Sequence, residues 1–64
     1  MDEKTIQELF DQLKRGERSE VRIKKEDFLN VRKVIVNRPD FKHLRGIAQR
    51  GGDVIYEYLK EPRS

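Results

Sequence analysis

The chain has no cysteine, a single histidine and only two serines among its 64 residues. Neither disulfide bonds nor thiolate zinc sites can therefore stabilise the fold. One imidazole is too few for a transition-metal site, which needs three or four ligands. A catalytic serine needs a base oriented by a third group and a preorganised oxyanion hole, whereas Ser19 and Ser64 both lie in segments that we expect to be mobile. The sequence thus predicts neither a metal centre nor nucleophilic catalysis.

Apolar residues are also scarce, at 34% of the chain against 42% charged residues, and no apolar run approaches the length of a membrane span. The first ten residues, MDEKTIQELF, are acidic where a signal peptide would be basic. We expect one small soluble cytoplasmic domain over residues 1–64, with a polar, frayed tail at 60–64. So short a chain has difficulty enclosing a water-excluded pocket, so we expect no catalytic residue, cofactor or small-molecule substrate.

An amphipathic helix is predicted for Thr5–Arg15. Thr5, followed three residues later by Glu8, matches a capping box, and Gly16 suits the left-handed position that ends a helix. The apolar residues recur with helical spacing and fall on one face; they are Ile6, Leu9, Phe10 and Leu13.

Residues 20–24 alternate charged and apolar side chains, which predicts a short strand with Val21 and Ile23 facing the core. Residues 25–37 follow as a predicted second helix, which must stop near Asn37 or Arg38 because Pro39 follows. Its apolar arc is wide, which predicts burial on more than one side. The β-branched residues 34–36 leave a strand as the alternative there. The arc is formed by Phe28, Leu29, Val31, Val34, Ile35 and Val36.

Two apolar-containing runs, 41–48 and 54–59, flank a pair of glycines and predict a β-hairpin with Gly51-Gly52 as a two-residue loop. In that register Ile47 lies opposite Tyr56. One face would hold the side chains that pack under the helices, and the other face would be free for contact. A slip of one residue would exchange the two faces. The packing face would comprise Leu44, Gly46, Ala48, Ile55 and Leu59, with Glu57, and the free face His43, Arg45, Ile47, Gln49, Val54, Tyr56 and Tyr58.

The predicted order is helix, strand, helix, strand, strand. This order indicates an α+β domain with a three-stranded antiparallel sheet and both helices on one face. It resembles a reduced winged-helix arrangement in its topology, with the hairpin as the wing. The usual helix-turn-helix pair does not fit, because the strand at 20–24 separates the two helices.

Positive charge is concentrated in the middle of the chain, where residues 32–50 hold six basic side chains against Asp40 alone. Aromatic and basic side chains interleaved on the free face of the hairpin could stack bases and neutralise phosphates. We therefore expect a non-catalytic binding module that prefers a nucleic acid, and we expect no membrane contact. The alternative is a protein partner or a second copy, docked on an edge strand or on the tyrosines. The candidate contact residues are Arg38, Lys42, His43, Arg45, Arg50, Tyr56 and Tyr58.

Overall fold

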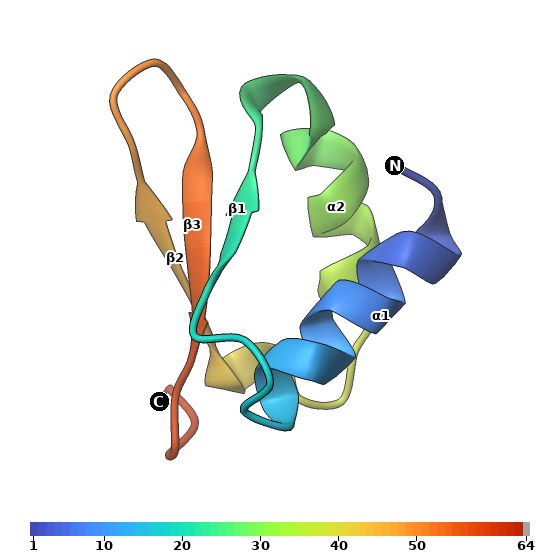
Figure 1. Cartoon of the computed structure of the whole chain (residues 1–64), viewed down its shortest axis with the longest axis vertical. Coiled ribbons are helices and arrows are strands. Elements are labelled where there is room, and N and C mark those ends of the chain that lie inside the picture. Colours follow the sequence, from blue (N-terminus) through green and yellow to red (C-terminus); the bar gives the residue numbers. More distant parts are fainter. Residues whose placement is uncertain (64) are drawn as a thin grey trace.

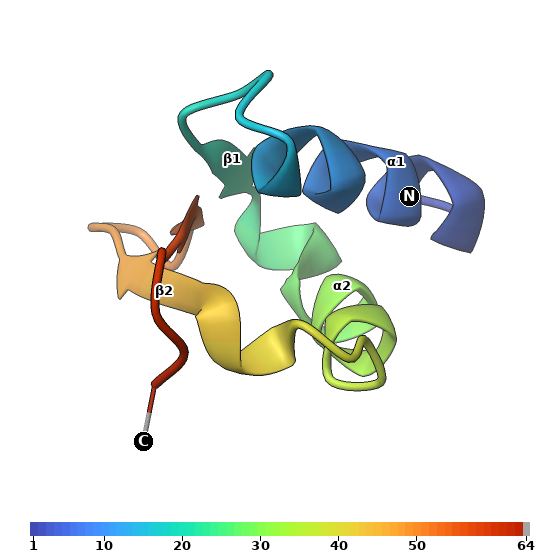
Figure 2. The ribbon, with the colours of Figure 1, turned by 90° about the horizontal axis from the view of Figure 1, so that it is seen from below.

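The computed structural model describes residues 1–63, which form two α-helices and a three-stranded antiparallel sheet (Figure 1). The two helices lie on one face of the sheet (Figure 2). The predicted α+β class and order of elements are therefore confirmed. The elements, with two short 3-10 turns (η), are α1 Glu3–Lys14, β1 Val21–Ile23, η1 Lys25–Asp27, α2 Phe28–Ile35, η2 Phe41–His43, β2 Leu44–Ala48 and β3 Val54–Tyr58.

Helix α1 begins earlier than predicted, because Asp2 is its N-cap. The Asp2 carboxylate accepts a hydrogen bond of 2.8 Å from the backbone N–H of Thr5, which is the third helical residue. The predicted capping box with Thr5 as the cap is therefore wrong. Aspartate caps more effectively here because its negative charge also lies at the positive end of the helix dipole. The helix ends as predicted before Gly16, whose φ of 79° is the left-handed conformation expected there.

The second helix is confirmed, and its first turn is the 3-10 segment η1. The strand alternative for residues 34–36 is wrong, since α2 runs to Ile35 and Val36 caps it. The buried face is narrower than predicted. Val31 and Ile35 are fully buried, whereas Leu29 is 71% exposed. Helix α2 packs mainly on α1, and its side that carries Leu29 is left uncovered.

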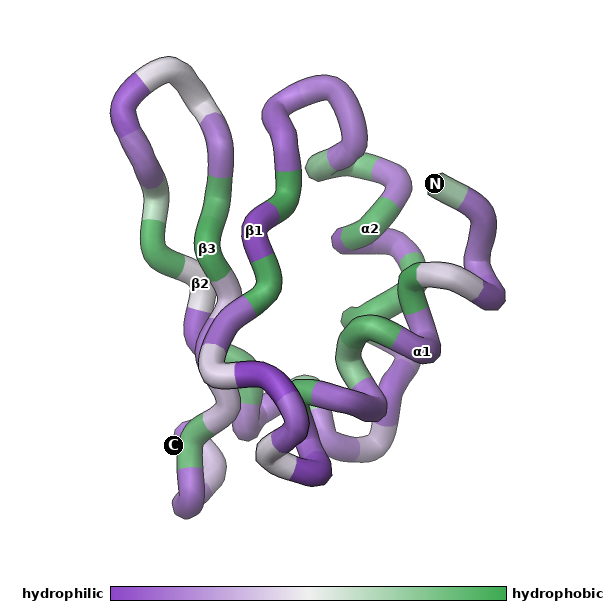
Figure 3. The backbone as a smooth tube through the Cα atoms, viewed as in Figure 1, coloured by the Kyte–Doolittle hydropathy of each residue, from purple (hydrophilic) through white to green (hydrophobic). Residues whose placement is uncertain are grey.

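Strand β3 is central, with β1 on one side and β2 on the other, and Figure 3 shows apolar and polar residues alternating along β1. The hairpin register differs by one residue from the predicted one, because Gly46, not Ile47, lies opposite Tyr56. The loop is also longer: Gln49 donates its N–H to the carbonyl of Asp53 (2.7 Å), which leaves residues 50–52 in the turn. Both glycines of that turn have positive φ.

The new register exchanges the faces of β3 but not those of β2. Leu44, Gly46 and Ala48 lie on the helical side as predicted. Their cross-strand partners on that side are Tyr58, Tyr56 and Val54, all assigned to the free face above. Ile55 and Glu57, which were assigned to the packing face, lie instead on the open side of the sheet. Because side chains alternate with a period of two, a shift of one residue moves a whole strand from one face to the other.

Tyr56 lies in the middle of the core. It is 5% exposed, and its ring packs edge-to-face on Phe10 of α1 at 5.4 Å between centroids. A Cβ atom on residue 46 would come within 3.2 Å of the Tyr56 ring, so glycine there makes room for it. The other buried apolar residues are Ile6, Leu13, Val21, Ile23, Val31, Ile35 and Leu44.

At Arg63 the chain lies against the start of the hairpin. The backbone N–H of Arg63 donates to the carbonyl of Lys42 at 2.8 Å, and Ser64 lies outside the described residues. Residues 41–43, predicted as strand, form the 3-10 turn η2 beside it. None of the described helices combines the length and apolarity that crossing a membrane would require.

Two substitutions in α2 test its orientation. Ile35→Ala removes a fully buried side chain and should lower the free energy of unfolding by about 2–4 kcal/mol. Leu29→Ala, on the exposed side of the same helix, should change it by less than about 0.5 kcal/mol. Urea unfolding followed by circular dichroism measures both, and equal losses would contradict the orientation of α2.

Candidate ligand-binding site

The seven predicted contact residues do not share one surface. Lys42, Arg45 and Arg50 are exposed, as expected. Tyr56 is buried under the helices, and the Arg38 side chain is only 8% exposed. Arg45 pairs with Glu57 on the open side of the sheet, away from both tyrosines. The basic-aromatic face predicted for the hairpin is therefore wrong, and the register is the reason.

His43 and Tyr58 contact each other instead of facing outward together. Their rings stack at 5.2 Å between centroids, and His43 Nδ1 is hydrogen-bonded to the carbonyl of Leu59 at 2.8 Å. Burial raises the pKa of Tyr58, and the negative charge of Asp40 raises it further. These contacts join the end of β3 to the segment that precedes β2.

Arg38 holds the turn after α2 against α1. Its guanidinium donates two hydrogen bonds to Asp40, at 2.8 and 3.1 Å, and one of 2.9 Å to Asp11. It also donates to the side chain of Gln7. The hydrogen bonds from Arg38 hold the pKa of Asp40 below its usual range. Arg38 thus has a structural role and is not free for a phosphate.

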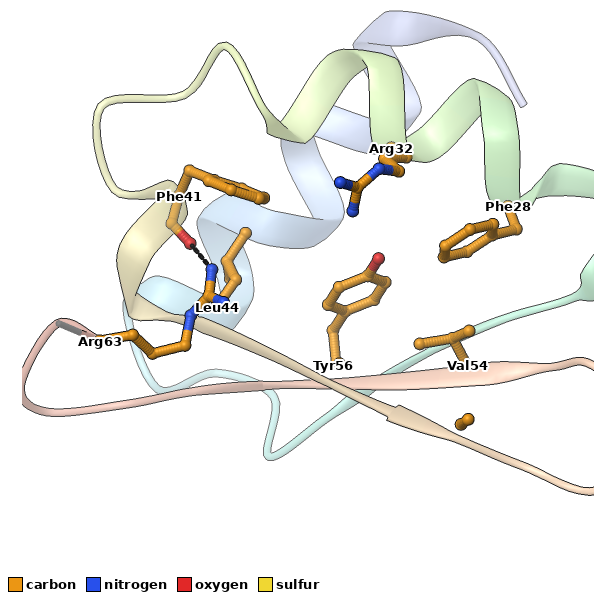
Figure 4. A pocket seen from close by; sticks show the side chains of 9 residues that line it. Phe28, Arg32, Phe41, Leu44, Val54, Tyr56 and Arg63 are labelled. Atoms are coloured by element: carbon orange, nitrogen blue, oxygen red, sulfur yellow. Dashed lines mark hydrogen bonds between the residues drawn. The ribbon is translucent and has the colours of Figure 1, made fainter.

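A pocket of about 310 Å³ lies between α2 and the β2 side of the hairpin (Figure 4). It exists because α1 covers β1 and β3 while α2 packs mainly on α1, which leaves β2 less covered. Gly46 and Ala48 contribute little side-chain volume to its wall. The lining residues are Phe28, Arg32, Phe41, Leu44, Gly46, Ala48, Val54, Tyr56 and Arg63.

The polar groups of this pocket are two guanidiniums and one phenol. In Figure 4 the Tyr56 hydroxyl and the Arg32 guanidinium point toward each other. Burial raises the pKa of Tyr56, and the charges of Arg32 and Arg63 partly oppose that rise. The hydroxyl therefore stays protonated at neutral pH and can donate a hydrogen bond.

Within residues 1–63 no carboxylate forms a salt bridge with these two arginines. The lining contains no acidic residue. Arg63 is held at the rim by neutral groups: it lies 5.2 Å from the centroid of the Phe41 ring and donates to the Phe41 carbonyl at 3.3 Å, as the dashed line in Figure 4 shows. The pocket thus presents positive charge beside aromatic walls.

Sequence reasoning missed most of this pocket. Its residues come from α2, η2, both hairpin strands and the tail, and no spacing along the chain connects those segments. The available signal was Gly46, since a lone glycine within a strand marks a close approach of another group. Among the described residues no cluster of three or more histidine, cysteine or acidic side chains could hold a metal ion.

Comparison with known proteins identifies the family. A family model described as YkzS-like protein matches residues 3–57, which include both helices and all three strands apart from the final residue of β3. The chain therefore belongs to the YkzS-like family. Searches of curated proteins and of solved structures found no match. Eight of the nine pocket residues lie within the matched segment, and Arg63 lies beyond it.

The Arg38–Asp40 pair predicts a dependence of stability on pH. The pKa of Asp40 is lowered in the folded state, so its stabilising contribution is complete above the unfolded pKa of about 4. That contribution is lost as the pH falls through the lower folded pKa. Wild-type protein should therefore lose thermal stability below about pH 4, and Asp40→Asn should lose less over the same range. Thermal melts from pH 2 to pH 7 measure both; identical profiles would contradict the assignment.

Arg38→Met tests the same pair at neutral pH. It leaves the Asp40 carboxylate buried without its partner and should lower the free energy of unfolding by about 3 kcal/mol. The double variant Arg38→Met/Asp40→Asn removes the stranded charge and should recover part of that loss, as a double-mutant cycle will show. A double variant no more stable than Arg38→Met would contradict the pairing.

Proposed function

We propose that this protein is a non-catalytic binding module that holds an anionic ligand in the pocket between α2 and the hairpin. The observation that carries the proposal is a pair of arginines at the pocket, Arg32 and Arg63, that form no salt bridge within residues 1–63, with Arg32 directed at the Tyr56 hydroxyl. In a chain with 12 acidic residues, two such cations at one pocket favour a negative charge supplied by a ligand.

The chemistry of the pocket suits a carboxylate on an apolar or aromatic group. Guanidinium binds carboxylate through two parallel hydrogen bonds, and the Tyr56 hydroxyl can donate a third. The rings of Phe28 and Phe41 would cover the apolar part of such a ligand. A volume of about 310 Å³ matches the lower end of ligand pockets.

We assign no chemical step to the pocket. Its lining holds no histidine, serine or carboxylate, so no side chain there is suited to exchange a proton with a ligand near neutral pH. The raised pKa of Tyr56 keeps that hydroxyl a hydrogen-bond donor and not a base. The ligand would be bound and released unchanged.

A nucleic acid is the second candidate, on a different surface. Lys42, Arg45 and Arg50 are exposed and could neutralise phosphates. With Tyr56 and Tyr58 turned to the helical side, no tyrosine is left beside them to stack bases. Binding at these cations would be weak, independent of base sequence and strongly reduced by salt.

NMR titration of ¹⁵N-labelled protein with 3-phenylpropionate tests the pocket. We expect shifts at Gly46 and at the Arg32 side chain, and little response to the neutral 3-phenylpropionamide. Arg32→Gln should weaken phenylpropionate binding about tenfold, because a hydrogen bond to a charged group contributes about 1.5 kcal/mol. Lys33→Gln, which removes the next cation of the same helix, is the matched control and should leave binding unchanged.

Two results would overturn the proposed function. One is equal binding of the acid and the amide, which would show that the arginines do not select charge. The other is a stronger response to a short single-stranded oligonucleotide, mapped to Lys42, Arg45 and Arg50 and lost at high salt, which would favour the second candidate.

A further inference from the structure

The outer edge of β2 has unpaired backbone groups beside the pocket. Residues in an antiparallel pair alternate between those whose N–H and C=O groups face the partner strand and those whose groups face away. The hydrogen bonds Gln49–Asp53 and Leu59–His43 show that the odd-numbered residues of β2 face β3. The amide groups of Gly46 and Ala48 therefore point away from the sheet.

No segment of the described chain, residues 1–63, covers this part of the edge. Strand β2 is the last strand on its side, and both Gly46 and Ala48 are exposed. At one end of the strand, η2 and Arg63 close the edge, and the N–H of Leu44 is bonded to the carbonyl of Phe41. The open stretch is thus short, and it coincides with the two small residues that line the pocket.

We propose that the ligand is an acidic side chain on an extended segment of another protein, which pairs with Gly46 and Ala48 as a fourth strand. This inference rests on the proposed function of the pocket. Alternate side chains of an added strand point to the helical side, where Gly46 and Ala48 leave room for them. A glutamate or aspartate there would bring its carboxylate toward Arg32 and Tyr56.

Charge favours an acidic partner over a second copy of this chain. Two copies joined through β2 would gather Arg32 and Arg63 of each protomer along one seam. Lys42, exposed in the turn η2 that precedes β2, would add further positive charge. The pocket supplies no carboxylate to compensate, so self-pairing brings like charges together. An acidic segment from another protein removes that repulsion.

The test measures how a peptide and a small acid bind to two variants of residue 48. The probes are the capped peptide Thr-Val-Glu-Val-Thr, its Thr-Val-Lys-Val-Thr counterpart and 3-phenylpropionate. Ala48→Pro removes an outward N–H without touching the pairing with β3, since proline is tolerated at such positions of an edge strand. Ala48→Ser keeps the N–H and the small size, and is the matched control.

We expect the glutamate peptide to bind wild type and Ala48→Ser alike and the lysine peptide not to bind. Ala48→Pro should weaken the glutamate peptide about tenfold. Because Ala48 also lines the pocket, the effect of proline on the pocket wall is measured separately with phenylpropionate, whose binding should weaken less than that of the peptide. If Ala48→Pro fails to fold, the same test can be made on the wild-type protein with an N-methylated peptide. The methyl groups are placed on the peptide nitrogens that would face β2. Peptide addition should also slow hydrogen exchange at Gly46 and Ala48.

The contradicting outcomes are distinct. If neither Ala48→Pro nor N-methylation weakens peptide binding while phenylpropionate still binds, the strand pairing is overturned. The proposed function of the pocket then still stands. Failure of phenylpropionate and peptide alike overturns both. A concentration-dependent dimer in sedimentation that Ala48→Pro dissociates overturns the acidic partner in favour of a second copy.

Discussion

The pairing of Gly46 with Tyr56 is the constraint on which the rest of the structure depends. A chain of 64 residues with 34% hydrophobic content has few large side chains to bury, and Tyr56 brings one of them to the middle of the central strand. Its ring contacts Phe10 of α1 on one side and lies over the glycine of β2 on the other. A shift of one residue would bring both tyrosines out and leave Ile55 to fill the space.

The same ring connects the core to the pocket. The body of Tyr56 is packed under α1, while its hydroxyl emerges where α2 leaves β2 uncovered. Arg32 points toward that hydroxyl and Arg63 lies beside Phe41, and within residues 1–63 neither forms a salt bridge. Arg38, equally basic, is bonded to two aspartates and holds the fold. Whether an arginine holds the fold or is available to a ligand thus depends on the partners that the fold places around it and not on the residue type.

The helices and β1 were predictable because their signals are local: the spacing of Ile6, Phe10 and Leu13, and the alternation of Val21 with Ile23. The hairpin register was not predictable, because two successive glycines fit a loop of two or of three residues and both registers place apolar side chains inside. The role of Arg38 depends on Asp11, 27 residues away. The pocket is lined by segments from Phe28 to Arg63, and these include the polar tail, which was not predicted to pack on the domain.

The most direct test of this arrangement is the register itself, measured by NOEs between α-protons across the hairpin. Residues in a pair without mutual hydrogen bonds have their Cα atoms about 4.5 Å apart, which gives strong contacts between their α-protons. We predict such contacts for Gly46 with Tyr56 and for Ala48 with Val54. Contacts of Ile47 with Tyr56 and of Gln49 with Val54 would contradict this register, since both tyrosines would then face solvent and the pocket would lose its hydroxyl.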